Sequence, residues 1–287
     1  MCITSRGEPT VSTLSIVIPA LNEAENLPHV FATIPLDELT EEGWGVEVII
    51  TDNGSTDGTA EIAASYGARV VHQPLRGYGN AYKAGIAAAR GEVIATGDAD
   101  CTYPFDDLPR LLRIVDEKRV EFLNTNRLGR ENREAMKPSH TVANHALSLI
   151  SRKLFKSEMR DSQSGMWVFR RYIWETLKVT SDGMGFSQEI KNAAVREGFR
   201  CLEVPIEYRP RGGEVKLNAV SDGVSNLAQL FRHRLKDNAL RTDTRSQWRD
   251  RSTRPVPAPL MPVQRGAASA TADHAAQEKV RTGHHGV

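Results

Sequence analysis

Short apolar runs alternate with helical patterns over the first half of the chain. Runs rich in branched apolar residues, which suit buried strands, occupy 14–19, 46–51, 69–72 and 92–96. Helical patterns begin at Asn22, cover 60–66 and 81–89, and run from Asp107 through Val115. Strand, loop and helix in repeated alternation predict an α/β fold, with a parallel sheet covered by helices on both faces.

The pattern changes after the short apolar segment at 121–124. Residues 128–140 are polar and predict a mobile loop, and helical spacing follows from Val142 to Leu154. A loop at 161–165 leads into the apolar segment 167–169, a helix is predicted at 189–194, and 201–208 indicates an edge strand interrupted by Pro205. The apolar stripe from Val224 to Leu235 has a basic flank. We interpret it as core-facing, with contact to a membrane surface as the alternative.

These patterns divide the chain into three parts. We predict a flexible N-terminus at 1–12, one domain at 13–240 and a disordered tail at 241–287, where periodicity is lost and Arg, Ser, Pro, Ala and Gly dominate. A length of 287 residues is enough for one large domain and a tail.

Composition narrows the classes of partner and compartment. The formal charge of +1 comes from 37 basic and 36 acidic residues, so no overall field attracts nucleic acid. Cys2, Cys101 and Cys201 are odd in number and far apart, which disfavours a disulfide framework or zinc ribbon and suits a reducing cytosol. No stretch approaches the roughly 20 apolar residues of a membrane span, and 1–13 lacks a secretory apolar region. We therefore expect a cytoplasmic protein, free or peripheral on the cytoplasmic face of a membrane.

Polar residues follow several of the predicted strands. In parallel sheets, ligands bind at the carboxyl ends of the strands. Pro19, Asp52, Gly77 and Asp98 all lie after predicted strands, so we expect them to share one rim.

Asp98 and Asp100 are the strongest candidates for chemistry on that rim. On an extended stretch they point to the same side, since side chains alternate with period two. Two close carboxylates repel each other unless a positive charge lies between them. A hard dication with oxygen ligands is the natural partner, and Mg²⁺ commonly shares such a site with substrate phosphates. The alternative is an ordinary Asp-rich turn.

Two further features favour a nucleotide diphosphate. Arg76 precedes Gly77-x-Gly79 at a helix N-terminus, where backbone N–H groups and a guanidinium could hold a pyrophosphate; a tight turn is the alternative. Asp52 could accept a hydrogen bond from a base, with helix capping as the alternative. The turn after the first strand has no glycine, which excludes a dinucleotide-binding Rossmann motif, and no P-loop is present.

The motifs together resemble a known family. Residues 16–23, 51–59 and 97–100 resemble the family 2 glycosyltransferases, which have the GT-A fold. Residues 161–165, 203–206 and 216–217 resemble the dolichyl-phosphate mannose/glucose synthase branch, and the resemblance covers Leu14 to Leu235 in the same motif order. It implies a Rossmann-like, mostly parallel central sheet. It also implies an inverting transferase that moves a hexose from a nucleotide-sugar to a polyprenyl phosphate.

The resemblance also implies roles for individual residues. The nucleoside would be held by Pro19, Ala20, Glu23 and Asp52; the pyrophosphate would lie near Arg76 and Gly79; and the sugar-nucleotide with its Mg²⁺ or Mn²⁺ would be held by Asp98 and Asp100. Thr102 stands where the branch often has Gln, and is a weaker metal ligand. The branch also often has Asp at position 53, where this chain has Asn53, and Arg at position 167, where it has Trp167. The donor is therefore expected to be a UDP- or GDP-hexose of undetermined identity.

The acceptor side is less well defined by the sequence. Arg127 is our choice for the acceptor phosphate, with Arg209, Arg211 and Lys216 as second choices and a solvated loop as the alternative for each. Glu189 is the best-placed general base for a hydroxyl acceptor; its alternative role is a carboxylate that stabilises a helix N-terminus. A lipid phosphate, already mostly dianionic at neutral pH, needs little help from a base.

Other functions fit the same motifs. The chain could be a soluble transferase with a small-molecule or natural-product acceptor. It could also be a catalytically silent sugar-nucleotide-binding subunit that supports a membrane-protein partner. The intact Asp98 and Asp100 argue against the silent subunit.

Overall fold

The computed structural model describes residues 12–129, 132, 135, 138–212 and 226–235. The predicted disordered tail at 241–287, nearly all of the predicted N-terminal segment and the Lys216–Leu217 motif lie outside these residues.

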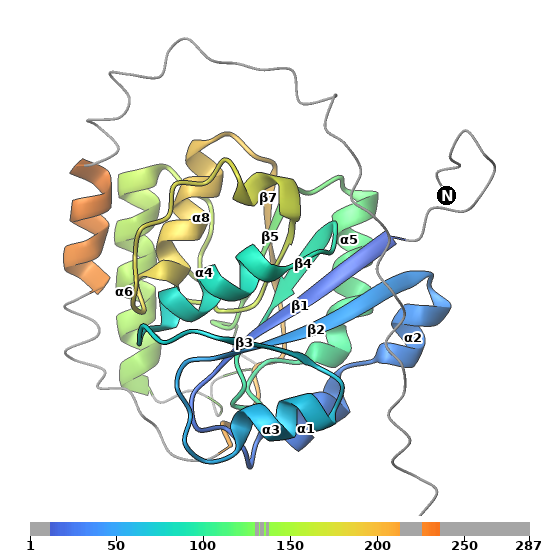
Figure 1. Ribbon diagram of the computed structural model, residues 1–287. Helices are drawn as coiled ribbons and strands as arrows, with labels where there is room; N and C mark the ends of the chain where they lie inside the picture. The colour runs from blue at the N-terminus through green and yellow to red at the C-terminus, as the bar shows by residue number, and fades with distance from the viewer. Residues whose placement is uncertain (1–11, 130–131, 133–134, 136–137, 213–225, 236–287) are drawn as a thin grey trace, which may run out of the picture.

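A mostly parallel sheet of seven strands forms the centre of the described part (Figure 1). The strand order is β3-β2-β1-β4-β6-β5-β7. β6 pairs antiparallel with both β4 and β5, and the other neighbouring pairs are parallel. The strands are β1 Ser12–Ala20, β2 Trp44–Asp52, β3 Arg69–His72, β4 Val93–Thr96, β5 Phe122–Asn126, β6 Trp167–Arg170 and β7 Cys201–Pro205. The sheet confirms the predicted α/β class and the predicted edge position of β7.

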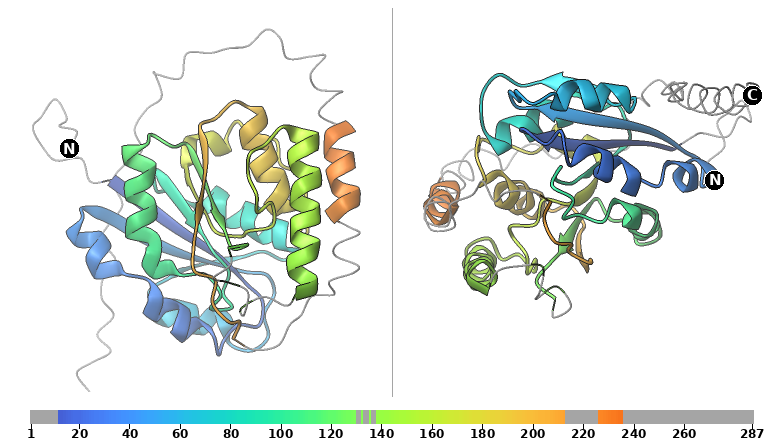
Figure 2. Two further views of the ribbon diagram at one scale, coloured as in Figure 1. Left: turned by 180° about the vertical axis from the view of Figure 1, so that it is seen from behind. Right: turned by 90° about the horizontal axis from the view of Figure 1, so that it is seen from below.

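Helices cover both faces of this sheet (Figures 1 and 2). α1, α2, α3 and α5 share one apolar core with the sheet, and α4, α7 and α8 share the other. α6 packs beside α8. The helices are α1 Leu27–Thr33, α2 Leu36–Glu41, α3 Thr59–Ser65, α4 Tyr78–Ala88, the 3-10 helix η1 Phe105–Asp107, α5 Leu108–Glu117, α6 Pro138–Phe155, α7 Arg171–Trp174 and α8 Phe186–Arg196.

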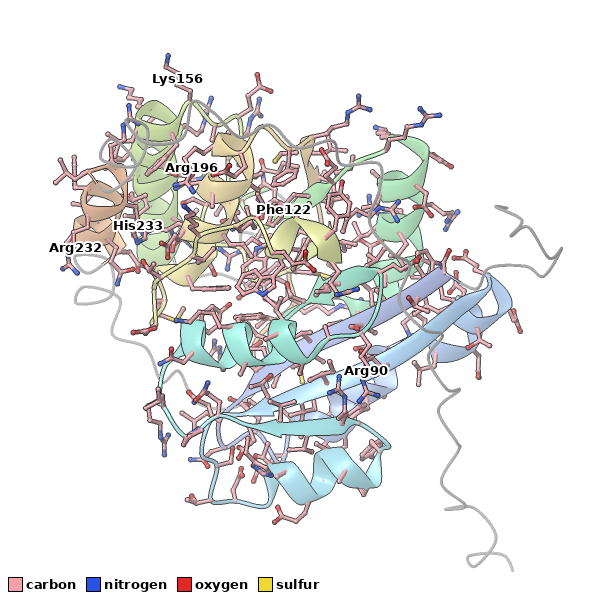
Figure 3. All side chains as sticks on the ribbon, turned by 45° about the horizontal axis from the view of Figure 1, so that its top comes forward. Arg90, Phe122, Lys156, Arg196, Arg232 and His233 are labelled. Atoms are coloured by element: carbon pink, nitrogen blue, oxygen red, sulfur yellow. The ribbon has the colours of Figure 1, made fainter. Side chains whose placement is uncertain are left out.

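A further helix at 226–235 lies beside α6 at the outer end of the molecule (Figures 1 and 2). Leu230 and His233 are buried, whereas the side chains of Phe231 and Leu235 are 51% and 69% exposed. Arg232 projects outward (Figure 3). The prediction that the stripe faces the core is therefore only partly confirmed. One side of the helix packs inward, while apolar residues remain exposed on the other side. In the described residues no helix has the length and apolar character needed to cross a membrane.

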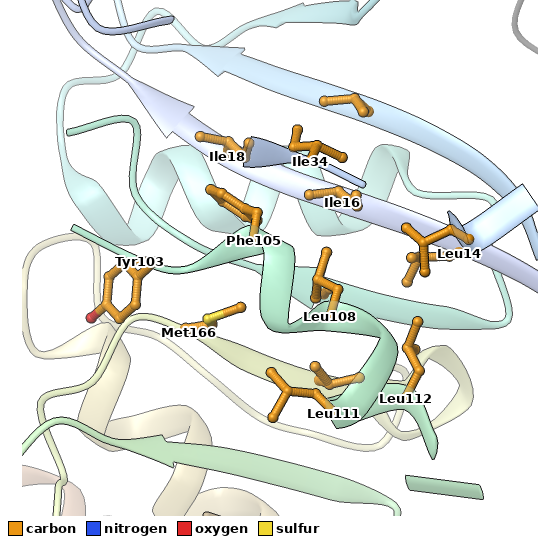
Figure 4. Close-up of a cluster of buried hydrophobic side chains, with 14 of the residues drawn as sticks. Leu14, Ile16, Ile18, Ile34, Tyr103, Phe105, Leu108, Leu111, Leu112 and Met166 are labelled. Carbon is orange, nitrogen blue, oxygen red and sulfur yellow. The ribbon is translucent and has the colours of Figure 1, made fainter. Parts of the chain in front are cut away.

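The strands contribute alternate residues to the two cores. Ile16 and Ile18 of β1 belong to the first core and Val17 to the second. Figure 4 shows Leu108, Leu111 and Leu112 of α5 in the first core, in the same cluster as Ile16 and Ile18 of β1. This two-sided burial explains why the strands are near-continuous apolar runs.

Two local predictions were wrong. The helix expected from Asn22 begins only at Leu27, because Asn22 has a positive φ of 53° and its side chain accepts a bond from the Thr56 N–H at 2.8 Å. The loop expected at 128–140 gives way to α6 at Pro138. In the loop before α6, Asn132 is buried, and its side chain donates to the carbonyls of Arg127 and Ile206 at 3.0 and 2.8 Å. The first error arises from a contact between segments that are distant in sequence.

Candidate functional site

The carboxyl ends of four parallel strands share one edge of the sheet. β1 and β2 end in register, with Ala20 opposite Asp52, and β3 ends with His72 opposite Asp52. β4 runs parallel to β1 on its other side. Because these strands run the same way, the segments that follow them meet at this edge, as the sequence predicted.

Asp98 lies two residues after β4 and is half-buried. The hydroxyls of Tyr78 and Tyr82, both from α4, donate to its Oδ1 at 3.1 Å each. Burial, and then the nearby charge of Asp100, raise the pKa of Asp98 to about 6. The carboxyl group therefore sits in an environment with too little positive charge.

Asp100 is 4% exposed and has different partners. The N–H and hydroxyl of Thr102 donate to its Oδ1 at 3.2 and 2.6 Å, and Arg211 Nη2 lies 2.5 Å from its Oδ2. Ala99, between the two acids, lies in a bend and not in a strand, and Cys101 just after them has a φ of 66°. The prediction that the two side chains alternate as on an extended strand is therefore wrong, although the two carboxylates still interact.

The two carboxylates fit a hard dication that is completed by a ligand. Among the described residues there is no group of three or more His, Cys, Asp or Glu side chains that could hold a metal alone. Mg²⁺ commonly takes one or two carboxylates and completes its oxygen shell with substrate phosphates and water. Burial, and then the charge of Asp100, raise the pKa of Asp98, and a cation bound between the two carboxylates would offset both effects. Thr102 is 1% exposed and its hydroxyl binds Asp100, so its contacts favour support of Asp100 over direct coordination.

Asp52 lies at the end of β2, 5% exposed. The Ser55 N–H donates to Oδ1 at 2.9 Å, and His72 Nδ1 lies 3.2 Å from Oδ2. Although burial opposes them, these hydrogen bonds hold the pKa of Asp52 below its usual value. Asp52 is therefore a stable anion at neutral pH, suited to accept a hydrogen bond from a ligand.

The residues expected around a nucleoside form one connected group with Asp52. Pro19 and Ala20 end β1, and the Ala20 carbonyl accepts a bond from the Asn53 N–H at 2.9 Å. Glu23 follows at half-burial, and its Oε2 accepts from the Asn26 side chain at 2.6 Å. The structure brings these sequence-predicted residues together at the β1–β2 end of the site.

Asn53 is a site residue that the sequence argument treated only as a departure from the branch. It is 5% exposed, and its Nδ2 donates to the carbonyls of Gln73 and Leu75, both at 2.8 Å. Its Oδ1 accepts from the Gly77 N–H at 2.8 Å. One side chain thus sets the path of the loop between β3 and α4. The position of Asn53 directly after the strand-end Asp52 was the signal available in the sequence.

The glycine-rich loop is less open than the predicted pyrophosphate cradle. A Cβ on Gly77 would clash with the carbonyl oxygen of Asp182, and one on Gly79 with that of Ser181. The Asn80 N–H also donates to the Asp182 carbonyl at 3.1 Å. The glycines therefore permit close packing of the 181–182 segment on the start of α4. Arg76 is exposed and donates to the Gly54 carbonyl at 3.0 Å, so its cation remains accessible near the loop.

Arg127 forms a buried ion pair with Asp161. Its N–H, Nε and Nη2 all bond the Asp161 carboxylate at 2.8–3.0 Å, and its guanidinium lies 5.2 Å from the centre of the Tyr208 ring. Although burial opposes it, Arg127 lowers the pKa of Asp161. The Arg127 guanidinium, which we expected to bind an acceptor phosphate, is therefore largely occupied by the Asp161 carboxylate.

The second-choice arginines differ in position. Arg209 pairs with Asp106 at 2.8 Å, whereas Arg211 reaches the Asp98–Asp100 pair itself. Lys216 lies outside the described residues. Of the second-choice residues that the structure describes, it is therefore Arg211 that lies at the Asp98–Asp100 pair.

Glu189 lies in the first turn of α8 and is buried. Its carboxylate accepts from the N–H groups of Thr180 and Ser181, at 3.0 and 2.7 Å, and its Oε1 lies 3.4 Å from His233 Nε2. Glu189 thus lies in the first turn of α8, as its alternative role requires, but its bonds hold the loop at 180–181 and not the helix N-terminus. Its role as a general base stays a prediction.

The chain matches a known protein family and several proteins of known sequence. The family model described as Glycosyl transferase family 2 matches residues 15–177, more than half of the chain. The match includes the segments that carry Asp52, Asp98, Asp100 and Arg127.

Two relatives come from Haloferax volcanii. The chain is 38% identical to the low-salt glycan biosynthesis hexosyltransferase Agl6 over 213 residues, 74% of this chain and 51% of that protein, so it spans about half of that relative's length. It is 32% identical to a dolichyl-phosphate hexose transferase over 218 residues, 76% of this chain and 92% of that protein.

Among solved structures, the chain resembles the Mycobacterium tuberculosis glucosyl-3-phosphoglycerate synthase. That structure contains Mn²⁺, UDP and glucosyl-3-phosphoglycerate. The TM-score is 0.61 at 22% sequence identity, with 78% of this chain and 79% of that chain covered. The likeness shows the fold, and it confirms the GT-A arrangement that the motifs predicted.

Proposed function

Because this chain belongs to glycosyl transferase family 2, we propose that it transfers a hexose from a nucleotide-diphosphate sugar to a polyprenyl phosphate. The observation that carries the proposal is the acid pair after β4, in which two tyrosines bind Asp98 and one arginine binds Asp100. A 32% identical relative named as a dolichyl-phosphate hexose transferase, matched over 92% of its length, supports this class of acceptor.

The donor is assigned to the rim formed by β1, β2 and β4. Pro19, Ala20, Glu23 and Asp52 would bind the nucleoside, and Arg76 the diphosphate. Asp98 and Asp100 would hold Mg²⁺ or Mn²⁺, and solved structures of the fold with Mn²⁺ or Mg²⁺ and UDP support this arrangement. A dication bound there supplies the positive charge that stabilises the departing nucleoside diphosphate. UDP- and GDP-hexoses both remain within the proposal.

The acceptor side fits a nucleophile that arrives already ionised. A phosphomonoester with a second pKa near ~6 is mostly dianionic at neutral pH. Both oxygens of Glu189 are engaged by Thr180 and Ser181, so this side chain is not poised to remove a proton. Arg211 places a positive charge beside Asp100, within the proposed site, and would attract an anionic acceptor. The site therefore provides what a phosphate acceptor requires, which is a nearby cation and no general base.

A transfer assay with two acceptor classes tests the proposal. UDP- and GDP-hexoses are first ranked by thermal shift with Mn²⁺, since a bound ligand raises stability by mass action. The best donor is then offered a polyprenyl phosphate in detergent, or a water-soluble sugar phosphate or polyol. Metal-dependent transfer to the polyprenyl phosphate is expected. Transfer only to the small acceptor, or nucleotide-sugar binding without turnover in any arm, would overturn it.

A lipid acceptor also requires contact with a membrane, and one surface suits an anionic bilayer. We propose that this contact is made by α6 and the helix at 226–235, which lie side by side (Figures 1 and 2). Val142 and Leu149 on α6, and Phe231 and Leu235 on the other helix, are 50–69% exposed. The same helices carry the basic residues Arg152, Lys153, Arg232 and Arg234, and Lys156 follows directly after α6. Lys156 and Arg232 project outward in Figure 3. Exposed apolar residues beside cations are typical of helices that lie in a bilayer interface.

Flotation with lipid vesicles tests this surface. Phe231→Ser combined with Leu235→Ser should reduce binding to vesicles that contain an anionic phospholipid, whereas Leu36→Ser, an exposed apolar position on α2, should not. Equal binding of all three proteins would exclude the surface. The proposed location is the cytoplasmic face, with which the free thiols of Cys101 and Cys201 agree.

A further inference from the structure

Lys191 is a buried lysine whose partners are not carboxylates. It lies in α8 with 1% of its surface exposed. Its Nζ donates to the backbone carbonyls of Asp161, Ser162 and Ser164, at 3.1, 2.9 and 2.7 Å. The Asp161 carboxylate is already bound by Arg127. Lysine is seldom fully buried without a charged partner, so this arrangement calls for a reason.

The three carbonyls belong to one turn, at 161–164. An ammonium group has three N–H donors and no acceptor, so three converging carbonyls match the charged form of lysine. Without a cation at their centre, the three oxygen dipoles would face one another in a buried space. The ammonium therefore stabilises a turn that the backbone would not otherwise adopt.

One end of this turn lies directly against the proposed reaction site. The Gly165 N–H donates to the Tyr103 hydroxyl at 2.6 Å, and the Tyr82 hydroxyl lies 3.2 Å from the Gly165 carbonyl. A Cβ on Gly165 would lie 2.5 Å from the Tyr78 hydroxyl, which itself binds Asp98, and 3.2 and 3.3 Å from the two carboxylate oxygens of Asp98. There is thus almost no free space between the turn and Asp98.

The other end of the turn positions a cation. The Asp161 carboxylate holds the Arg127 guanidinium through two side-chain bonds, at 2.8 and 2.9 Å. A shift of the turn would therefore move Arg127 and the wall beside Asp98 together. Lys191, which holds the middle of the turn, controls both.

We propose that Lys191 is a positioning residue for sugar transfer. Its ammonium group holds the 161–165 turn in the form that places Gly165 next to Asp98 and keeps the Asp161 carboxylate bound to Arg127. This inference rests on the proposed transferase function. It assigns Lys191 no contact with the reacting atoms. Residues at the nucleoside end, such as Asp52, belong to other elements and should not depend on it.

The charge of Lys191 should be sensitive to pH near neutrality. Burial lowers its pKa to about 7, against the opposing charges of Asp161 and Glu203, while Arg127 acts in the same direction as burial. As pH rises through this value the ammonium is lost, one donor disappears, and a lone pair must face a carbonyl. The turn should therefore loosen on the alkaline side.

Lys191→Met tests the inference, because Met keeps the length and removes both charge and donors. Lys178→Met, at an exposed position, is the control. We expect the rate constant kcat for transfer to fall at least tenfold in Lys191→Met, with nucleotide affinity in Mn²⁺ changed less than threefold. The alkaline decline of kcat between pH 6 and 9 should also disappear. A kcat within twofold of the control, or nucleotide affinity lost in parallel with kcat, would overturn the proposal.

Hydrogen exchange gives a readout that does not depend on activity. Backbone amides of residues 162–165 should exchange at least tenfold faster in Lys191→Met, with those of β1 unchanged. Equal protection at 162–165 would overturn the inference even if the protein transferred no sugar. An inactive wild type would instead count against the proposed function.

Gly165→Ala serves if Lys191→Met does not fold. It leaves Lys191 in place and adds a methyl group against the Tyr78 hydroxyl and Asp98, so the turn must move away from them. We expect the same split, with kcat at least tenfold lower and nucleotide affinity retained. Wild-type kcat in Gly165→Ala would show that the placement of the turn does not matter, and would overturn the inference.

Discussion

Arg211 Nη2 lies 2.5 Å from Oδ2 of Asp100, so a cation from the segment after β7 neutralises one of the two acids that follow β4. These residues are separated by more than a hundred positions in the chain. Their contact makes the acid pair unsymmetrical, because the hydroxyls at Asp98 are neutral and the guanidinium at Asp100 is charged.

Removal of Arg211 should separate metal binding from acceptor use. In Arg211→Met, Asp100 loses its positive partner, so Mn²⁺ alone should bind several-fold more tightly in a calorimetric titration. The KM for the phosphate acceptor should rise at least tenfold, because the site loses a cation. Arg209→Met, whose arginine pairs with Asp106, is the matched control and should change neither. Weaker Mn²⁺ binding in Arg211→Met would show that Arg211 does not compete for Asp100.

Asp161→Asn should be strongly destabilising. The substitution leaves the buried Arg127 guanidinium without its carboxylate, and breaking a buried pair in this way typically costs about 3–5 kcal/mol. Urea denaturation at pH 7 measures the loss in the free energy of unfolding. Asp116→Asn, at a half-exposed ion pair with Arg170, should change it by less than about 1 kcal/mol.

The same pair predicts a pH dependence. The pKa of Asp161 is lower in the folded protein than its ordinary 3.8. Its stabilising contribution is therefore fully present above pH 3.8 and is lost as pH falls through the folded pKa. The stability difference between wild type and Asp161→Asn should accordingly shrink below about pH 4. A difference that is constant from pH 7 to pH 3 would contradict this account.

Asn53→Asp should damage the site although the side chains have the same shape. The carboxylate cannot donate, so the two bonds to the carbonyls of Gln73 and Leu75 become repulsive contacts. We expect a loss of about 1–3 kcal/mol in unfolding free energy, the cost of unsatisfied buried groups. The thermal shift produced by nucleotide and Mn²⁺ should also fall. A variant as stable as wild type would mean that the loop takes another path. Asn80→Asp, at the exposed side chain that bonds the Arg76 carbonyl, is the comparison.

Glu189→Gln distinguishes the two types of acceptor. With a phosphate acceptor no general base is needed, so kcat should fall less than tenfold, while stability falls because the amide cannot accept all the bonds from Thr180 and Ser181. Asp100→Ala should reduce kcat by about 100-fold or more, as expected when a charge-stabilising group is removed. Steady-state kinetics at saturating donor measure both. A comparable large loss in the two variants would favour a hydroxyl acceptor.

Much of the first half of the chain could be predicted from local patterns. The branched apolar runs that became β1, β2 and β4 are mostly buried, and a residue in a strand covered on both faces must be apolar whichever helix covers it; β3, at one edge of the sheet, is only partly buried. Parallel strands bring their carboxyl ends to one edge, so the expectation that Asp52 and Asp98 would meet there followed from element order alone.

The wider arrangement of the site was decided only by the tertiary structure. β6 runs antiparallel between β4 and β5, which brings the 161–165 turn against Asp98; the carbonyls of Ser181 and Asp182 cover Gly77 and Gly79; and Arg211 returns to Asp100. Each of these contacts joins segments that are far apart in the chain, and the periodic pattern of a strand or helix gives no information about such contacts.

The sequence by itself determined the strands, the edge at which they end and the acids placed there, because these depend on interactions between near neighbours and on the period of a strand or helix. It did not determine which cation faces which acid, or that Lys191 would bind three carbonyls of one turn. Those choices depend on how distant segments pack, and packing is settled by the burial of the whole chain rather than by any one stretch of it.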